Sequence, residues 1–261
     1  SMRLFQALTR FFEDDNKQYR VFVRKDPFEI SGGGTALPRS YLFGYSDAMQ
    51  PTLLSLKNML AHEMIHNWTQ LEDEPYGSGT WYTEGLTEYY SVMLPLRFNL
   101  ATLGETLCQI QKRTDQYYTN PVRHLSNMEA AAQSWTDRRA QRIPYGRGFF
   151  FLADLDARIK KESGGKKSID EIARTLDRYA RNGRPGTTKD FLRLVKEQMG
   201  WDLTDEFEKV ASGAIQPPNP DSFDGLFTCR PVMTTEADTG KPVQSWQWSV
   251  KNESNTEKIL G

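Results

Sequence analysis

The sequence has little of several features that would assign it to a class of protein. Only two cysteines and three histidines occur among its 261 residues, and the net charge is −1. Cys108 and Cys229 lie far apart without CxxC spacing, which excludes a disulfide framework and a cysteine-based zinc knuckle. The near-zero charge gives no bulk attraction to nucleic acid. No apolar run approaches the length of a membrane span.

What is present indicates a globular protein with a sizeable core. Apolar residues make up 38% and charged residues 26% of the chain. No signal-peptide pattern opens the chain, but Ser1-Met2 resembles a tag-cleavage scar, so we expect an excised fragment. The compartment therefore stays open between cytoplasmic, periplasmic and secreted.

Apolar spacing predicts an α+β protein that is mostly helical, with a little sheet near each end. Pro217-Pro218-Asn219-Pro220 interrupts any helix, so we expect three parts: residues 1–99 with a small sheet, a helical part over 100–216, and a linker with a β tail over 217–261. The predicted strands are 19–26, 39–45, 226–234 and 243–250, with a glycine loop at 32–34. The predicted helices are 2–13, 52–68, 83 into the nineties and ended or strained near Pro95, two or three within 100–142, 144–163, 168–181, 187–199 and 203–212.

The segment His62-Glu63-Met64-Ile65-His66 indicates metal chemistry. Residues four apart on a helix lie one above the other, so both imidazoles can hold one metal, and Glu63 lies beside them where it can reach a metal-bound water. The helix is expected to be apolar around most of its circumference and therefore buried. Polar groups inside such a helix are costly unless something satisfies them, and a divalent cation does so. The alternative is a core histidine pair with a solvated Glu63.

A catalytic zinc needs a third protein ligand, and the segment from Gly79 to Tyr90 offers one. Glu84 begins a second helical pattern, and Glu88 lies one turn later on the same face. We expect Glu84 to bind the metal and Glu88 to accept the second ring N–H of one histidine. An exposed surface carboxylate is the alternative for Glu88.

These two motifs, HEMIH and WYTEGLTEYY, resemble those of the gluzincin zinc metallopeptidases, and among them the glycyl aminopeptidase family with its associated PDZ domains. His66-Asn67-Trp68 and the segment from Pro144 to Phe150 are similar to further parts of that family. The resemblance implies a thermolysin-like catalytic domain, one zinc ion per chain, a peptide substrate, and flanking β-sandwich and PDZ domains in the full-length protein.

The resemblance also assigns roles outside the zinc motifs. It implies that the Tyr145 hydroxyl stabilises the oxyanion, which agrees with a position at a helix start where the dipole favours negative charge. Tyr145 packed in an aromatic cluster is the alternative. It places substrate binding at Gly33, Gly34 and Thr35, where relatives carry a glutamate that holds the substrate's amino group. Here that stretch has no acidic residue, and spacing gives no argument for Glu29 as a substitute.

The sequence therefore predicts zinc-dependent hydrolysis of peptides by an aminopeptidase. His62, His66 and Glu84 would hold the zinc, Glu63 would act as general base, and the peptide would lie along an edge strand near 39–45. An endopeptidase of the same fold and a catalytically inactive module that binds peptides or a partner protein are the alternatives.

Overall fold

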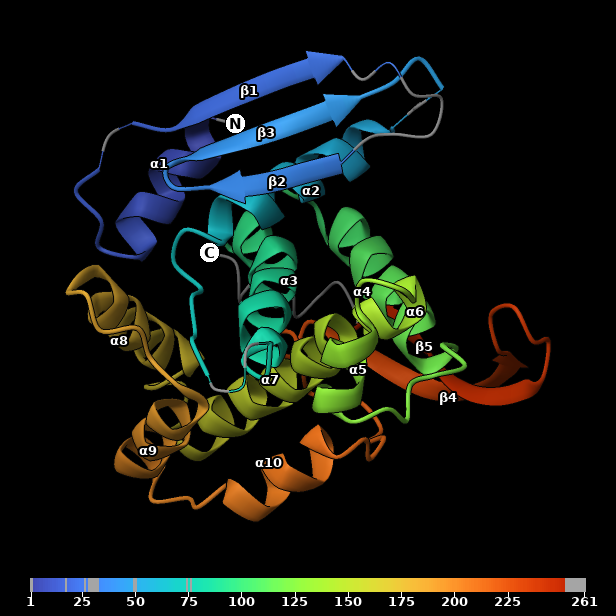
Figure 1. The fold of residues 1–261 in the computed structure, drawn as a ribbon. Helices are drawn as coiled ribbons and strands as arrows, with labels where there is room; N and C mark the ends of the chain where they lie inside the picture. The colour runs from blue at the N-terminus through green and yellow to red at the C-terminus, as the bar shows by residue number, and fades with distance from the viewer. Residues whose placement is uncertain are drawn as a thin grey trace.

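The computed structural model describes residues 2–16, 18–25, 27, 33–48, 51–73, 75 and 77–251. The protein is mostly helical with small sheets, as predicted (Figure 1). Its helices are α1 (Met2–Phe11), α2 (Leu53–Ile65), α3 (Thr80–Arg97), α4 (Leu103–Tyr118), α5 (Asn127–Gln133), α6 (Arg138–Gln141), α7 (Ile143–Glu162), α8 (Ile169–Arg181), α9 (Thr188–Met199) and α10 (Thr204–Ala211).

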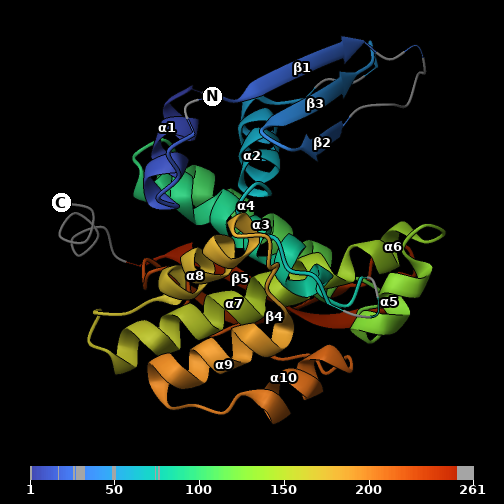
Figure 2. The ribbon, with the colours of Figure 1, turned by 60° about the vertical axis from the view of Figure 1, so that its left-hand side comes forward.

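A three-stranded sheet lies at one end of the molecule, with α2 between it and the helical body (Figure 2). It consists of β1 (Arg20–Lys25), β2 (Gly33–Leu37) and β3 (Ser40–Tyr45) in the order β1-β3-β2. The central strand β3 runs parallel to β1 and antiparallel to β2.

The glycine stretch corrects two expectations. Gly33 and Gly34 pair with Gly44 and Phe43, so they begin strand β2 and do not form a loop. Because β3 lies in the centre of the sheet, the edge strand next to α2 is β2, and the prediction of an edge strand at 39–45 is wrong. Antiparallel pairing with β3 holds these glycines extended in spite of their weak strand propensity.

Helix α2 begins after Thr52, whose hydroxyl caps the helix by accepting a hydrogen bond from the N–H of Ser55 at 3.1 Å. The expectation that this helix is buried around most of its circumference is wrong for its first half. Leu53 is 71% exposed, and the residues buried within α2 are Ala61, Met64 and Ile65. The first turns line an open, mostly apolar cavity shared with α1, α3 and α4, which leaves them partly exposed.

Helices α3 and α7 cross at very short distance because each carries a glycine at the crossing. A Cβ on Gly85 would lie 2.5 Å from Cα of Gly148, and a Cβ on Gly148 would overlap the carbonyl oxygen of Trp81. Only glycine permits this approach, and it brings the first turn of α7 beside Glu84.

Pro95 does not end α3, which continues to Arg97. A proline leaves the carbonyl four residues earlier without its helical donor. Here that carbonyl belongs to Ser91, and the side-chain amide of Asn58 on α2 donates to it at 3.4 Å. The neighbouring helix thus supplies the hydrogen bond that the proline removes.

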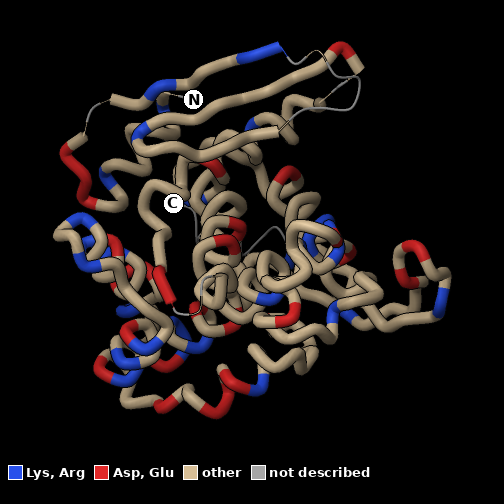
Figure 3. The backbone as a smooth tube through the Cα atoms, in the orientation of Figure 1, with Lys and Arg blue, Asp and Glu red and all other residues tan. Residues whose placement is uncertain are grey.

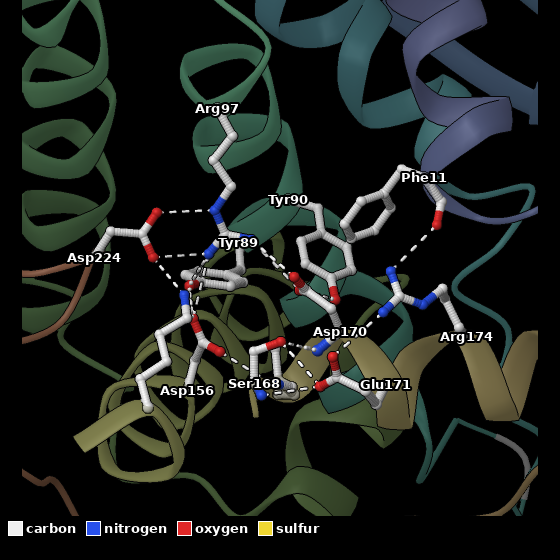
Figure 4. A network of polar contacts seen from close by, with 12 residues as sticks. Phe11, Tyr89, Tyr90, Arg97, Asp156, Ser168, Asp170, Glu171, Arg174 and Asp224 are labelled. Atoms are coloured by element: carbon white, nitrogen blue, oxygen red, sulfur yellow. Dashed lines mark hydrogen bonds and ion pairs between the residues drawn. The ribbon is translucent and has the colours of Figure 1, made fainter. Parts of the chain in front are cut away.

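The far end of α3 enters a buried group of charges that we call the Arg97 network (Figure 4). Arg97 binds both oxygens of Asp224, at 2.8 and 2.9 Å, and Lys160 lies 2.6 Å from Asp156. The members of the network are Arg97, Asp156, Lys160, Asp170 and Asp224, contributed by α3, α7, α8 and the segment before β4.

The chain ends in a hairpin of β4 (Phe227–Thr235) and β5 (Pro242–Val250), which packs on α4. The indole N–H of Trp248 donates to the Thr114 hydroxyl at 3.0 Å, which joins the hairpin to the helical body. Positive and negative residues are intermingled along α8, α9 and α10, as expected for solvated helix faces (Figure 3). In the part of the chain that the structure describes, we find no helix long and apolar enough to cross a membrane.

Candidate metal centre

Helix α2 presents its two histidines toward one point. Their Nε2 atoms lie 3.0 Å apart, and their rings are nearly perpendicular, with centroids 4.6 Å apart. His62 and His66 are one helical turn apart, so a regular helix suffices to align them.

Glu84 from α3 completes the group. Its Oε2 lies 3.3 Å from Nε2 of His62 and 3.4 Å from Nε2 of His66. Among the described residues, these three side chains form the one group of His, Cys, Asp or Glu that converges closely enough to hold a metal ion. We refer to His62, His66 and Glu84 as the metal centre.

The donor atoms of the metal centre fit zinc. Tetrahedral zinc with ligand bonds of about 2.0–2.1 Å requires donor atoms roughly 3.3 Å apart, close to the three separations found. Glu84 Oε2 is buried and has no hydrogen-bond partner in the protein. Burial opposes the charge of this carboxylate, but the two imidazoles beside it hold the pKa of Glu84 well below its usual range. An ionised buried oxygen without a partner is a suitable ligand for a cation.

The Nδ1 atom of each histidine, which does not face the metal centre, has a polar partner in the protein. Glu88 Oε1 lies 3.5 Å from Nδ1 of His62, where Glu88 was predicted to act. The Thr87 hydroxyl lies 3.3 Å from Nδ1 of His66 and donates to the carbonyl of Thr83 at 2.6 Å. The sequence analysis missed Thr87, although its position three residues after Glu84 puts it on a neighbouring line of the same helix.

The second oxygen of Glu88 forms an ion pair with Arg113 of α4. The sequence analysis missed this contact too, because nothing in the local sequence links α4 to the zinc motifs. Burial opposes the charge of Glu88, but Arg113 and His62 lower its pKa. For His62, burial disfavours the imidazolium, yet the carboxylates of Glu84, Glu88 and Glu63 raise its pKa overall.

Glu63 lies on the sheet side of the metal centre, below strand β2. The backbone N–H of Ala36 lies near its carboxylate and favours the charged form. A Cβ on Gly34 would lie 2.7 Å from Oε1 of Glu63, so only glycine leaves room for this side chain. Burial raises the pKa of Glu63, while the nearby histidines lower it in part, and the net shift is upward. A raised carboxyl pKa suits a group that must take up and release a proton.

The predicted substrate-binding residues lie on this strand. Gly34 adjoins Glu63, whereas a Cβ on Gly33 would meet nothing within 4 Å. Thr35 follows in the same strand and pairs with Leu42. The glutamate considered as a substitute for the amine-binding residue, Glu29, lies outside the described residues, as does Gly32.

Tyr145, in the first turn of α7, reaches the metal centre from the other side. Its ring is parallel to that of His62, with centroids 6.1 Å apart, and its hydroxyl is close enough to Glu84 for that carboxylate to affect its pKa. Burial first, and then the negative charge of Glu84, raise the pKa of Tyr145, so the hydroxyl keeps its proton. The guanidinium of Arg142 lies 5.0 Å from the centre of the ring. Tyr145 is therefore in reach of an oxygen bound near Glu84.

A cleft of about 690 Å³ opens beside Glu84 and Tyr145. Its size is within the range of small-molecule sites in proteins. Trp135, which also lines this cleft, is 90% exposed. Neither the cleft nor Trp135 was predicted, because α5 and the segment after it reach the metal centre through packing on α3, α6 and α7.

Comparison with known proteins agrees with this geometry. Residues 55–145, which hold all of the metal centre and Tyr145, match the family model of the M61 glycyl aminopeptidases. The chain is 25% identical over 195 residues to leucine aminopeptidase 2 of Candida albicans. The alignment covers 61% of this chain and 30% of that protein.

Solved structures show the same fold. An aminopeptidase N family protein from Idiomarina loihiensis superimposes with a TM-score of 0.68 at 16% identity, over 92% of this chain and 46% of that one. An M1 zinc metallopeptidase from Deinococcus radiodurans gives a TM-score of 0.54 at 21% identity, over 84% of this chain and 45% of that one. These matches bear out the resemblance to the gluzincin zinc metallopeptidases. The chain spans less than half the length of each of these relatives.

Proposed function

We propose that this chain, as a relative of the gluzincin zinc metallopeptidases, is a thermolysin-like catalytic domain that removes residues from the amino terminus of peptides. The observation that carries the proposal is the convergence of His62, His66 and Glu84 on one point, with Glu63 beside it. The family match over residues 55–145 and the leucine aminopeptidase relative support aminopeptidase activity.

The residues around the metal centre would have different roles in peptide hydrolysis. A zinc ion held there would lower the pKa of a bound water and polarise the scissile carbonyl. Glu63 would take a proton from the attacking water and pass it to the leaving amine. The Tyr145 hydroxyl would donate a hydrogen bond to the oxyanion as charge develops on it.

The peptide would lie extended along the outer edge of β2. Main-chain hydrogen bonds to an exposed strand edge are a common way to hold a substrate without reading its sequence. Glu63 lies directly under Gly34 and Ala36, so a peptide on this edge would pass over the metal centre. The strand that binds substrate is thus β2, next to the residues 39–45 that the sequence suggested.

An endopeptidase is the second candidate, and a specific observation favours it. The described part of the substrate edge, Gly33–Leu37, carries no acidic residue. A buried ammonium group without a carboxylate partner binds poorly. An enzyme that does not bind the free amino group would cut within a chain.

The test is hydrolysis of an unblocked peptide library, with Glu63→Gln as the key variant. Losing a general base lowers kcat by about 10²- to 10⁴-fold, while the zinc content of purified protein should stay at one per chain. Glu162→Gln, an exposed carboxylate at the end of α7, is the matched control and should retain the activity of the parent. Retained turnover in Glu63→Gln would refute its role as base, and zinc binding without hydrolysis in the parent would favour a catalytically inactive peptide-binding module.

A second assay separates the two peptidase candidates. The same peptides with free and acetylated amino termini are compared at equal concentration. An aminopeptidase should lose nearly all activity on acetylated peptides, because it must bind the free amine. Equal rates on both sets would establish the endopeptidase.

The organisation of the longer protein stays a prediction. This holds for the three ranges 1–99, 100–216 and 217–261 and for the flanking β-sandwich and PDZ domains. The fraction of each relative that this chain covers leaves room for further domains in those relatives.

A further inference from the structure

Arg113 of α4 is a buried cation next to the metal centre that touches none of its three ligands. Its side chain is 7% exposed, and Nη2 forms an ion pair with Oε2 of Glu88. The other oxygen of Glu88, Oε1, faces Nδ1 of His62 at 3.5 Å. One carboxylate therefore joins the guanidinium to the imidazole.

The guanidinium is itself held by several helices. Nη1 donates to the side-chain oxygen of Gln109 at 2.9 Å, and Nη2 donates to the side-chain oxygen of Asn58 at 2.9 Å and to the Ser91 hydroxyl at 3.3 Å. The ring of Phe149 on α7 lies 5.7 Å from its central carbon. Asn58 belongs to α2, one turn before His62, and Ser91 to α3, so contacts to both metal-binding helices fix the position of Arg113.

A buried arginine is a poor choice for stability alone. Taking a guanidinium out of water is costly, and an apolar side chain of the same size is often neutral or stabilising in its place. Its planar, rigid set of donors, however, lets the bonds to Gln109 and Asn58 fix the nitrogen that faces Glu88. Without it, Glu88 would be a buried carboxylate one turn from that of Glu84, and among the described residues its close ion pair with His62 would be the one left to it.

We propose that Arg113 is a positioning residue for the metal centre, acting on His62 through Glu88. Arg113 fixes the carboxylate that accepts the Nδ1–H of His62. That hydrogen bond leaves Nε2 as the ligand atom and orients the ring toward the metal. The inference rests on the proposed function, because it takes the His62, His66 and Glu84 group to hold zinc.

The experiment measures zinc affinity by competition with a chelator, independently of hydrolysis. Arg113→Met should raise the zinc Kd by about 10- to 100-fold, the usual effect of losing a partner behind a metal ligand. Arg113→Lys keeps the charge but loses the planar set of donors and should lie between parent and Arg113→Met. Arg142→Met removes an exposed cation that also acts on Glu88 over a longer range, and its zinc Kd should stay within about threefold of the parent.

A double-mutant cycle with Glu88→Gln distinguishes positioning from general damage to the fold. If Arg113 acts through Glu88, then adding Arg113→Met to Glu88→Gln should change the zinc Kd by less than about threefold. The proposal would be overturned if the effects of Arg113→Met and Glu88→Gln on the free energy of zinc binding were fully additive. It would also be overturned if Arg113→Met left the zinc Kd unchanged. All variants are compared as folded protein, verified by circular dichroism.

The inference and the proposed function fail in different ways. If the parent binds zinc but cuts no peptide, the proposed function is wrong, and the zinc affinities still decide the role of Arg113. If the parent cuts peptides and the cycle is additive, the function stands and the positioning role is wrong. If the parent binds no zinc at all, both are overturned.

Discussion

Helix α3 contributes to two buried polar clusters, which differ in whether their charged groups are fully paired within the protein. The Arg97 network sets three aspartates against one arginine and one lysine, all within the protein. Two tyrosines of α3 also contribute, as the Tyr89 hydroxyl donates to Asp156 at 2.6 Å and the Tyr90 hydroxyl donates to Asp170 at 2.9 Å. No buried side-chain nitrogen or oxygen of these charged residues, all of them described, lacks a hydrogen-bond partner.

The metal centre, at the other end of the same helix, is not satisfied by the protein alone. Glu84 Oε2 is buried without a hydrogen-bond partner, and two imidazole nitrogens face it at 3.3 and 3.4 Å. A closed network holds elements together, whereas a cluster that leaves a donor set unpaired is suited to bind an ion. The comparison thus separates a structural cluster from a functional one by hydrogen-bond satisfaction and not by burial.

Glu84→Ala should produce the largest effect, on the metal centre alone. Removing the charged ligand should raise the zinc Kd by more than about 10³-fold, or about 4 kcal/mol, which exceeds the 10- to 100-fold typical of a residue behind a ligand. Equilibrium competition with a chelator measures the zinc Kd. Glu88→Gln, on the same helix, is the reference variant and should raise the zinc Kd by a smaller factor. A zinc Kd within tenfold of the parent would show that Glu84 is not a ligand.

Arg97→Met should show the opposite pattern. Removing one partner of a buried ion pair leaves uncompensated charge, so the free energy of unfolding should fall by about 3–5 kcal/mol in chemical denaturation. The zinc Kd of the folded protein should not change, because none of the ion pairs of the Arg97 network involves His62, His66 or Glu84. A large loss of zinc affinity would mean that the two clusters are coupled along α3.

Tyr145→Phe removes a donor to the oxyanion and leaves the zinc ligands in place. We expect kcat to fall by about 10²- to 10³-fold, or about 3 kcal/mol, at nearly constant zinc Kd and stability. Steady-state kinetics on a good peptide substrate measure the change. An effect confined to KM would instead place Tyr145 in substrate binding.

Asp224→Asn should have the smallest effect, and one that depends on pH. Burial opposes the charge of Asp224, but Arg97 and Lys160 hold its pKa well below its usual range. A depressed carboxyl pKa stabilises the folded state above the unfolded pKa of about 3.9, and this stability is lost as the pH falls below it.

The variant should therefore lower the free energy of unfolding by roughly 1–3 kcal/mol at pH 7, and the difference from the parent should narrow below about pH 4. Asparagine tolerates the left-handed backbone of this position, where φ is 59°, so the substitution changes charge with little strain. A difference that stays constant from pH 7 to pH 3 would show that Asp224 does not act through its charge.

Helix positions and the convergence of the candidate metal ligands could be predicted because each depends on local spacing. His62 and His66 are four residues apart, and Glu84 and Glu88 share one face of the next helix. The course of the N-terminal sheet could not be predicted in full. Gly33 and Gly34 have weak strand propensity, and only pairing with β3 holds them in a strand. How α3 accommodates Pro95 could not be predicted for a similar reason, since the amide that replaces its hydrogen bond comes from Asn58 on another helix.

By itself the sequence determined which side chains could bind an ion, since the helical repeat alone places two imidazoles on one line and two carboxylates on another. Only the tertiary structure decided what stands behind and around them: Arg113 from α4, the strand edge above Glu63, and the cleft lined by Trp135. Contacts between elements distant in sequence depend on how helices and strands pack, and local periodicity carries no information about that packing.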